Sequence, residues 1–198
     1  MRLYYSTPSP FSSKVRMVAR QCGVELDCVV VDTSQNPEEL LEANPLGKIP
    51  ALRLDDGRTV YDSRVICEYL DRTSGTGLYP QEPDAWLWTK TFEATVDGIL
   101  DAMILCGYEA RYRPEEKWHQ PWVDRQWGKA MRGLATIEAS IDRLPPELGI
   151  CQFAVASMLG SLRLRFAGRW EDACPKLAAW GEDFCRRYPD FAEMMPRV

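Results

Sequence analysis

The sequence predicts a chain in two parts, a small α/β unit followed by a unit made only of helices. Strand-like apolar segments occur only in the first third of the chain, where they alternate with helical patterns. A stretch rich in Gly, Pro, Ser and Thr, residues 73–83, then precedes long amphipathic patterns. We therefore expect an α/β domain at 1–75, a linker at 76–84 and an all-helical domain at 85–198.

The α/β unit is expected to have the element order β-α-β-α-β-β-α. Ser9 is suited to the N-cap of the first helix and Pro10 to its first turn, and Gly23 is suited to end it. Asp55-Asp56-Gly57 is a turn signal between the last two strands. The predicted strands are 3–5, 28–31, 51–54 and 59–61, and the predicted helices are 10–22, 37–43 and 63–72.

The second unit is expected to contain long helices and no strands. Its predicted helices are 85–111, 115–144, 150–166 and 175–187, with a short tail at 190–195. The third is apolar on all sides, which predicts a buried central helix. Gly149 and Gln152 stand where this helix needs an N-cap and a third residue that bonds back to it.

Composition excludes several classes of function. A content of 45% hydrophobic and 27% charged residues is that of an ordinary globular protein. The net charge of −5 argues against nucleic acid as a partner. No apolar run approaches the roughly 18 residues that span a bilayer, and the N-terminus lacks the apolar core of a signal peptide.

The seven cysteines are scattered and odd in number, and no two form a C-x-x-C pair. Several fall on apolar helix faces, so we expect reduced core thiols and a cytoplasmic protein. The single histidine, His119, leaves no Cys/His spacing that fits a zinc site, so no metal is expected.

Two segments point to a peptide-like ligand with a free carboxylate. Pro50 directly precedes a predicted strand and has no N–H, which leaves the backbone groups of Ile49 free to pair with an extended ligand. Asp62 and Ser63 begin a predicted helix, and the N-terminus of a helix with a free hydroxyl is a site for a carboxylate. Both residues are also ordinary capping residues.

Three motifs in combination resemble the glutathione S-transferase superfamily, and within it most closely the small bacterial YibF-like glutathione transferases. The motifs are Ser9-Pro10-Phe11-Ser12-Ser13-Lys14-Val15-Arg16, Asn44-Pro45-Leu46-Gly47-Lys48-Ile49-Pro50 and Tyr61-Asp62-Ser63. The resemblance covers essentially the whole chain. It implies a thioredoxin-like N-terminal domain, a C-terminal domain that is a bundle of helices, and a homodimer.

The resemblance also implies the site. Glutathione would serve as co-substrate, its cysteinyl backbone pairing with Ile49 beside a cis Pro50, and its γ-glutamyl carboxylate on Ser63 and the amides of that helix. Asp62 belongs to the same binding set. Lys48 either neutralises a ligand carboxylate or is an exposed loop lysine.

Ser9 stands where the family places its catalytic residue, with Ser12 as the alternative. A thiolate is the nucleophile, and a free thiol of pKa ~8.5 is mostly protonated at neutral pH. A hydroxyl that donates a hydrogen bond to the sulfur lowers that pKa, and the positive end of the first helix acts in the same direction. Ser9 is also an ordinary N-cap residue, and both roles can coexist.

The function that follows is a cytoplasmic glutathione transferase that conjugates a small electrophile, as in detoxification. The alternatives are a non-catalytic glutathione-binding or protein-interaction module and a glutathione-dependent isomerase. Because position 9 is not cysteine, disulfide exchange is disfavoured. Met103, Tyr108, Tyr112 and Trp118 are candidates for an apolar co-substrate pocket, although helical aromatics more often belong to a core or an interface.

Overall fold

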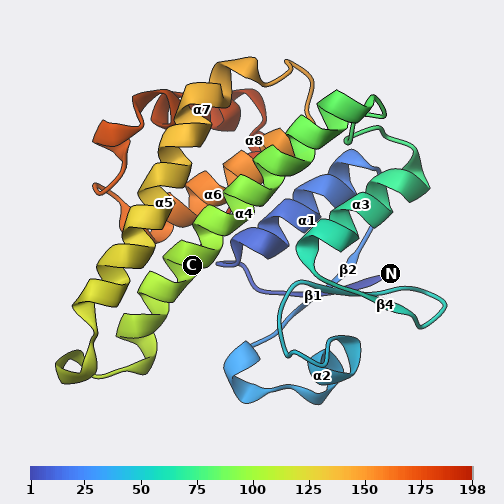
Figure 1. Cartoon of the computed structure of the whole chain (residues 1–198). Helices are drawn as coiled ribbons and strands as arrows, with labels where there is room; N and C mark the ends of the chain where they lie inside the picture. The colour runs from blue at the N-terminus through green and yellow to red at the C-terminus, as the bar shows by residue number, and fades with distance from the viewer. Residues whose placement is uncertain (198) are drawn as a thin grey trace.

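The computed structural model describes residues 1–197 and places a four-stranded sheet at one end of a bundle of helices (Figure 1). The strands are β1 (Arg2–Tyr5), β2 (Asp27–Val30), β3 (Ala51–Arg53) and β4 (Thr59–Val60). Their order is β2-β1-β3-β4, with β1 parallel to β2 and antiparallel to β3. A parallel pair needs a crossover connection, which helix α1 (Pro10–Gln21) supplies.

The alternation of side chains along the strands decides which helix covers which face. Leu3 and Leu52, paired in register, belong to the main core together with α1 and α3 (Ser63–Ser74). Tyr4 and its partner Ala51 point the other way and pack with Leu40 of α2 (Glu38–Ala43). Helices α1 and α3 therefore cover one face of the sheet, and α2 covers the other.

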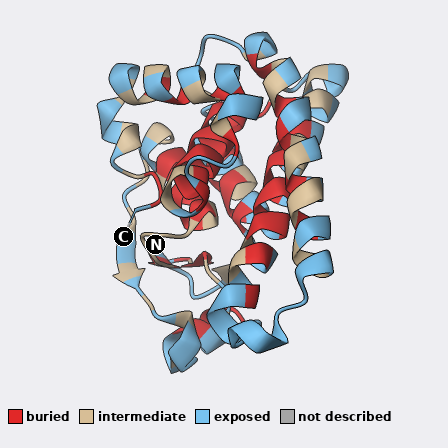
Figure 2. Cartoon of the chain, turned by 90° about the vertical axis from the view of Figure 1, so that its left-hand side faces the viewer, coloured by how far each residue is buried: buried red, intermediate tan, exposed pale blue. Residues whose placement is uncertain are grey.

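The second unit is a bundle around a buried helix. Its helices are α4 (Pro83–Tyr112), α5 (Gln120–Ser140), α6 (Ile150–Phe166), α7 (Pro175–Arg187) and the short α8 (Pro189–Ala192). Every residue from 150 to 162 in α6 is buried, which confirms the expected central helix, and Figure 2 shows burial concentrated there and on the facing sides of its neighbours. At its start, the Gly149 N–H donates to Gln152 Oε1 at 3.1 Å, as expected.

Helices α4 and α5 lie against each other along their length (Figure 1). At Gly133 on α5 a Cβ atom would come within 2.5 Å of Ile99 Cγ1 on α4. The lack of a side chain at this position is therefore what lets the two helices approach so closely.

The order β-α-β-α-β-β-α is confirmed for residues 1–74, and the strand bounds differ from prediction by at most one residue at each end. The predicted helix 115–144 is wrong at both ends. A 3₁₀ turn occupies Glu115–Lys117, and α5 begins only at Gln120. Pro121 has no N–H and is tolerated only in the first turn of a helix. At the other end Leu144 is extended, as the residue before a proline usually is.

The domain bounds 1–75 and 85–198 remain predictions, with α3 ending at Ser74 and α4 beginning at Pro83. Several cysteines are expected in the core, and four of the seven are buried. The side chains of Cys67, Cys106, Cys151 and Cys174 are buried, whereas Cys28 is exposed because β2 is the edge strand of the sheet.

Candidate functional site

Ser9 is the N-cap of α1 and is half-buried. Its backbone is extended, with φ −82° and ψ 117°, and its Oγ accepts a hydrogen bond from the backbone N–H of Ser12 at 3.2 Å. Accepting this bond uses a lone pair of the hydroxyl and leaves its hydrogen free to donate. Ser9 therefore presents a donor at the positive end of a 12-residue helix.

The two serines in the first turn of α1 are buried. Ser13 Oγ accepts a 3.2 Å hydrogen bond from Ser157 Oγ on α6, which ties α1 to the central helix. Ser12 Oγ is also buried, and within residues 1–197 it has no hydrogen-bond partner. Of the two serines that are candidates for the catalytic residue, Ser9 is partly exposed and Ser12 is fully buried.

The loop before β3 is shaped by Asn44, which is 3% exposed. Its Nδ2 donates to the carbonyl of Lys48 at 2.9 Å, and its Oδ1 accepts from the backbone N–H of Leu46 at 3.1 Å. Gly47 has a φ of +60°, a conformation that glycine adopts without steric cost. The Asn44 side chain thus closes the turn that presents Lys48 and Ile49.

Ile49 is half-buried and is joined to Pro50 by a cis peptide bond, as the resemblance implies. Its backbone N–H and C=O take part in no hydrogen bond with residues 1–197. An extended peptide laid beside Ile49 would find both groups unpaired. Lys48 is exposed, and its ammonium lies within 4 Å of no carboxylate in the described chain.

The start of α3 combines a carboxylate with a serine that is almost fully buried. Asp62 is the N-cap, and its Oδ1 accepts from the backbone N–H of Arg64 at 3.0 Å while its Oδ2 pairs with the Arg64 guanidinium at 3.1 Å. Burial raises the pKa of Asp62, but Arg64 outweighs it and holds that pKa below its ordinary value. Asp62 is therefore a carboxylate at neutral pH. Ser63, the first helical residue, is 3% exposed.

Strand pairing brings these three segments to one end of the sheet. In an antiparallel pair the end of one strand lies beside the start of the other, and Tyr4 near the end of β1 pairs with Ala51 at the start of β3. Val60 at the end of β4 likewise pairs with Leu52. The residues after β1, before β3 and after β4, which include Ser9, Pro50 and Asp62, therefore meet at the same edge.

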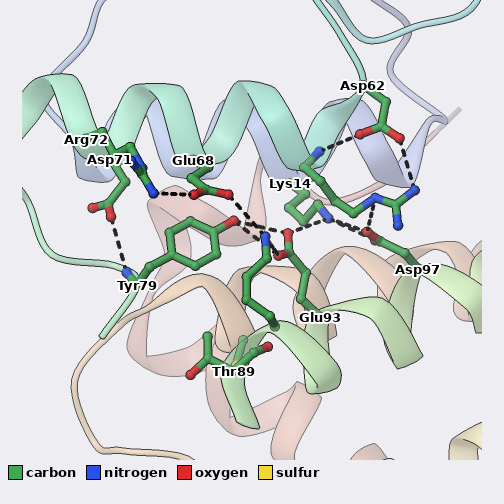
Figure 3. Close-up of polar contacts among 12 residues, drawn as sticks. Lys14, Asp62, Glu68, Asp71, Arg72, Tyr79, Thr89, Glu93 and Asp97 are labelled. Atoms are coloured by element: carbon green, nitrogen blue, oxygen red, sulfur yellow. Dashed lines mark hydrogen bonds and ion pairs between the residues drawn. The ribbon is translucent and has the colours of Figure 1, made fainter. Parts of the chain in front are cut away.

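Behind this edge lies a buried cluster of charges that the sequence analysis did not single out (Figure 3). Lys14 Nζ contacts both carboxylate oxygens of Asp97, at 2.8 and 2.9 Å, and Glu93 Oε1 at 3.1 Å. The three side chains are 2%, 4% and 0% exposed. Burial lowers the pKa of Lys14, but the two carboxylates outweigh it and raise that pKa above its ordinary value.

The cluster links the α/β unit to α4 and extends to the edge of the sheet where Ser9, Pro50 and Asp62 meet. Tyr79 donates its hydroxyl to Glu93, while Arg64 Nε lies 3.7 Å from Asp97 and also holds Asp62 (Figure 3). Asp71 of α3 accepts from the backbone N–H groups of Leu78 and Tyr79, at 2.6 and 3.2 Å, and so anchors the connecting segment. Lys14 thereby holds α1 against α4, and Arg64 joins α3, which begins with Ser63, to the same Asp97 carboxylate.

Four of these positioning residues stand in sequence patterns that indicate where they lie. Asn44 opens a segment with Pro45 and Gly47, and Asn commonly bonds to the backbone two residues on in such turns. Lys14 is four residues from both Pro10 and Val18 and thus lies on a face of α1 that is buried. Glu93 and Asp97, four residues apart, fall within the apolar stripe of α4 in the same way.

The candidate pocket residues separate into two groups. Met103 is 1% exposed and belongs to the core, so a role in lining a pocket is excluded for it. Tyr108, Tyr112 and Trp118 are exposed, at the end of α4 and just beyond it. Two shallow hollows of about 250 and 220 Å³ lie elsewhere, one beside Trp86 and one beside Trp180, and neither contains a predicted site residue.

Within residues 1–197, no group of three His, Cys, Asp or Glu side chains is arranged to hold a metal ion. No helix in that same part of the chain has the length and apolar character needed to cross a membrane.

Comparison with known proteins agrees with this arrangement. Residues 8–73 match the glutathione S-transferase N-terminal domain, and residues 120–182 match the C-terminal domain. The chain is 27% identical to the uncharacterized GST-like protein YibF of Escherichia coli over 169 residues, 83% of each chain. A glutathione transferase family member from Pseudomonas fluorescens, solved with bound glutathione, is 37% identical, with a TM-score of 0.91 over 100% of this chain and 99% of that one.

A second structure described as a glutathione transferase family member from Pseudomonas fluorescens contains bound S-(propanoic acid)-glutathione. It is 37% identical to this chain, with a TM-score of 0.86 over 100% of both chains. Both domain matches and the likeness over full length confirm the resemblance and the expected fold. The chain therefore belongs to the glutathione S-transferase superfamily.

Proposed function

We propose that the protein is a glutathione transferase in which Ser9 holds the thiol of glutathione as a thiolate for attack on a small electrophile. The observation that carries this proposal is the hydrogen bonding of Ser9. Its Oγ accepts from the Ser12 N–H, so its own hydrogen remains free to donate. A sulfur anion placed there gains that hydrogen bond and the field of the α1 N-terminus, and both lower its pKa.

The other residues at this edge of the sheet suit the rest of glutathione, which is a tripeptide. The unpaired backbone groups of Ile49, next to Pro50, pair with the cysteinyl unit. The γ-glutamyl carboxylate sits on the Ser63 hydroxyl and the first amides of α3, while the ionised Asp62 accepts from the γ-glutamyl ammonium. Lys48, which has no carboxylate partner in residues 1–197, is free to reach the glycyl carboxylate.

The reaction itself needs little more than this from the protein. The sulfur forms a bond to an electrophilic carbon, and the displaced electron pair departs with a leaving group. In an addition, the pair moves to the neighbouring atom, which takes a proton from solvent. The two Pseudomonas structures, with glutathione and with S-(propanoic acid)-glutathione, support a site of this kind in a close relative.

We also propose that the protein acts as a cytoplasmic homodimer in detoxification of small electrophiles. Val65 on α3 is 53% exposed, and Trp86 and Leu87 at the start of α4 are 40% and 58% exposed. Exposed apolar side chains of this size on neighbouring helices are typical of an interface. Sedimentation equilibrium of the wild type and of Val65→Glu tests the dimer, since a charge on this surface is expected to yield monomers.

The function is tested by comparing Ser9→Ala with Ser12→Ala. Calorimetric titration measures glutathione affinity, and 1-chloro-2,4-dinitrobenzene serves as a generic electrophile for turnover. Ser9→Ala is expected to lower kcat/KM by roughly 10²-fold, the usual cost of one donor to a reacting anion, while the Kd changes by less than about tenfold. Ser12→Ala, which removes a buried hydroxyl without a partner, is expected to behave like the wild type.

Each other outcome changes the proposal. Equal turnover in Ser9→Ala and the wild type would remove Ser9 from the mechanism, and a loss confined to Ser12→Ala would transfer the role to Ser12. Glutathione binding without turnover of any electrophile would support the non-catalytic module. Turnover without net consumption of glutathione would support the isomerase.

A further inference from the structure

The loop that carries Ser9, residues 6–9, depends on distant donors for its backbone hydrogen bonds. Within the loop, the Ser9 N–H donates to the carbonyl of Ser6 at 3.2 Å. Pro8 has no N–H to offer. The carbonyls of Thr7 and Pro8 accept instead from residues in the C-terminal third of the chain, at 3.3 and 2.8 Å. The conformation of this loop is therefore set in part by the helical unit.

Arg165 on α6 is the donor to Pro8, and its guanidinium is held at a second point. Its Nη2 donates to the Pro8 carbonyl at 2.8 Å, and its Nη1 donates to Ser161 Oγ at 3.0 Å. Ser161 lies about one turn earlier on α6 and is 2% exposed. Because a guanidinium is planar and rigid, holding one of its nitrogens also restricts the direction of the other. Helix α6, which packs against α1 (Figure 1), thus directs a fixed donor at the residue before Ser9.

The other donor, the backbone N–H of Arg197, also depends on α6. A Cβ atom at Gly160 on α6 would come within 2.5 Å of Pro196 Cδ, so the segment that contains Pro196 and Arg197 packs directly on this helix. The Arg197 N–H then donates to the Thr7 carbonyl at 3.3 Å. Two successive carbonyls of the loop are therefore held against the buried central helix of the bundle.

Holding the Pro8 carbonyl fixes the peptide plane that leads into Ser9. The carbonyl oxygen and the Ser9 N–H belong to one planar unit, so a bond that holds the first also orients the second. On its other side, the Ser9 carbonyl accepts from the Ser13 N–H at 3.0 Å. With the backbone held at both ends, the bond from the Ser12 N–H sets the direction of Ser9 Oγ. A donor to a reacting anion has to be placed to within about 0.5 Å.

We propose that Arg165 is a positioning residue for the catalytic hydroxyl, and that its bond to Pro8 holds Ser9 where the hydroxyl donates to the sulfur of glutathione. This inference rests on the proposed function and names a residue that acts through Ser9. Within residues 1–197, the bonds of the Arg165 side chain go to Pro8 and Ser161 and not to the segments proposed to bind the rest of glutathione. Loss of Arg165 should therefore affect the thiolate more than the affinity for glutathione.

The test is a double-mutant cycle of Arg165→Met with Ser9→Ala, assayed with glutathione and 1-chloro-2,4-dinitrobenzene. Arg165 is exposed, so its replacement leaves the core intact. Arg165→Met is expected to lower kcat and kcat/KM together by roughly tenfold at neutral pH, with the Kd of glutathione nearly unchanged. In the Ser9→Ala background the same change is expected to have less than about a twofold effect, because the hydroxyl that Arg165 positions is already absent.

The pH dependence of kcat/KM gives a second readout. A poorly placed hydroxyl bonds the sulfur less well, which raises the pKa of the bound thiol and leaves less thiolate at neutral pH. The loss in Arg165→Met is therefore expected to be largest near about pH 6.5 and to shrink above about pH 9, where the thiol ionises without help. A variant that had only lost folded protein would show no such recovery at high pH.

Arg163→Met is the matched control. Arg163 lies on the same helix and likewise donates to a backbone carbonyl, that of Ala178 on α7, at 3.3 Å. Because this bond holds α7 and not the loop with Ser9, Arg163→Met is expected to keep the wild-type kcat and pH profile. Far-ultraviolet circular dichroism of each variant checks that it is folded.

A wild-type kcat in Arg165→Met overturns the inference. So does an equal loss in the wild-type and Ser9→Ala backgrounds, because Arg165 would then act independently of Ser9. An equal loss in Arg163→Met also overturns it, because any disturbance of α6 would then be sufficient. Each of these results leaves the proposed function intact as long as Ser9→Ala itself loses turnover. Wild-type turnover in Ser9→Ala overturns the proposed function, and the inference with it.

Discussion

Replacing Lys14 by methionine tests whether the buried charges hold the two units together. The change removes an ammonium that contacts Asp97 at 2.8 Å and Glu93 at 3.1 Å and leaves both carboxylates almost fully buried. Breaking a buried ion pair on one side costs about 3–5 kcal/mol of unfolding free energy, because the remaining charge has lost its partner and cannot reach water.

For Lys14→Met, the expected loss of unfolding free energy is near the lower end of this range, about 3 kcal/mol. Lys90 still lies 3.2 Å from Glu93, and Arg64 still lies 3.7 Å from Asp97, so neither carboxylate is left without a cation nearby. Methionine also fills most of the volume of the lysine stem, which keeps the cavity small. The cost is therefore electrostatic, and neutralising the carboxylates should recover part of it.

The assay is urea unfolding at pH 7, followed by tryptophan fluorescence and far-ultraviolet circular dichroism. Lys14→Met/Glu93→Gln/Asp97→Asn is expected to be more stable than Lys14→Met, since no buried charge then lacks a partner. Arg20→Gln is the control, because it breaks a surface pair on the same helix whose side chains are 47% and 68% exposed. It is expected to cost at most about 1 kcal/mol. A Lys14→Met variant within 1 kcal/mol of the wild type would refute the reasoning.

Two further predictions concern pH and packing. Asp97 and Glu93 outweigh burial and raise the pKa of Lys14 above its ordinary value of 10.5. The stability that protonated Lys14 gives the fold is therefore complete below the ordinary value and is lost as the pH rises from there through the raised pKa. The stability difference between wild type and Lys14→Met should thus stay constant from about pH 7 to 10; a decline below pH 9 would contradict this. Gly133→Ala places a Cβ 2.5 Å from Ile99 and is expected to cost about 1–3 kcal/mol in thermal unfolding. Gly98→Ala, on the exposed face of α4 with nothing within 4 Å, should instead gain about 0.5–1 kcal/mol, and a reversed order would mean that α4 and α5 are not packed this closely.

Most of the fold was predictable because its signals are local. The strand segments, the N-cap Ser9 with Pro10, and the apolar helix α6 each follow from patterns within one element. The error at α5 arose because the prediction joined residues 115–119 to the amphipathic pattern that follows them, while Pro121 decided where a helix can begin.

The candidate site was predictable only in part. The proline before β3, the start of α3 and the first turn of α1 all carry residues whose local chemistry suits a ligand, so the sequence predicts them as candidates. Asn44 was missed because its contribution is to hold the backbone of Lys48 rather than to contact a ligand. The bond from the Arg165 guanidinium to the carbonyl of Pro8, at 2.8 Å, could not be predicted, because nothing near position 165 indicates it.

By itself, then, the sequence determined the order of the elements and the buried helix α6, and it predicted three candidate ligand-binding segments, since these depend on neighbours within one or two turns. The tertiary structure decided which charges meet. Lys14 and Glu93 are 79 residues apart in the chain, and Arg165 and Pro8 are 157 apart. A charged side chain looks the same in sequence whether it is solvated or paired, because its partner is chosen by packing between helices that are distant along the chain.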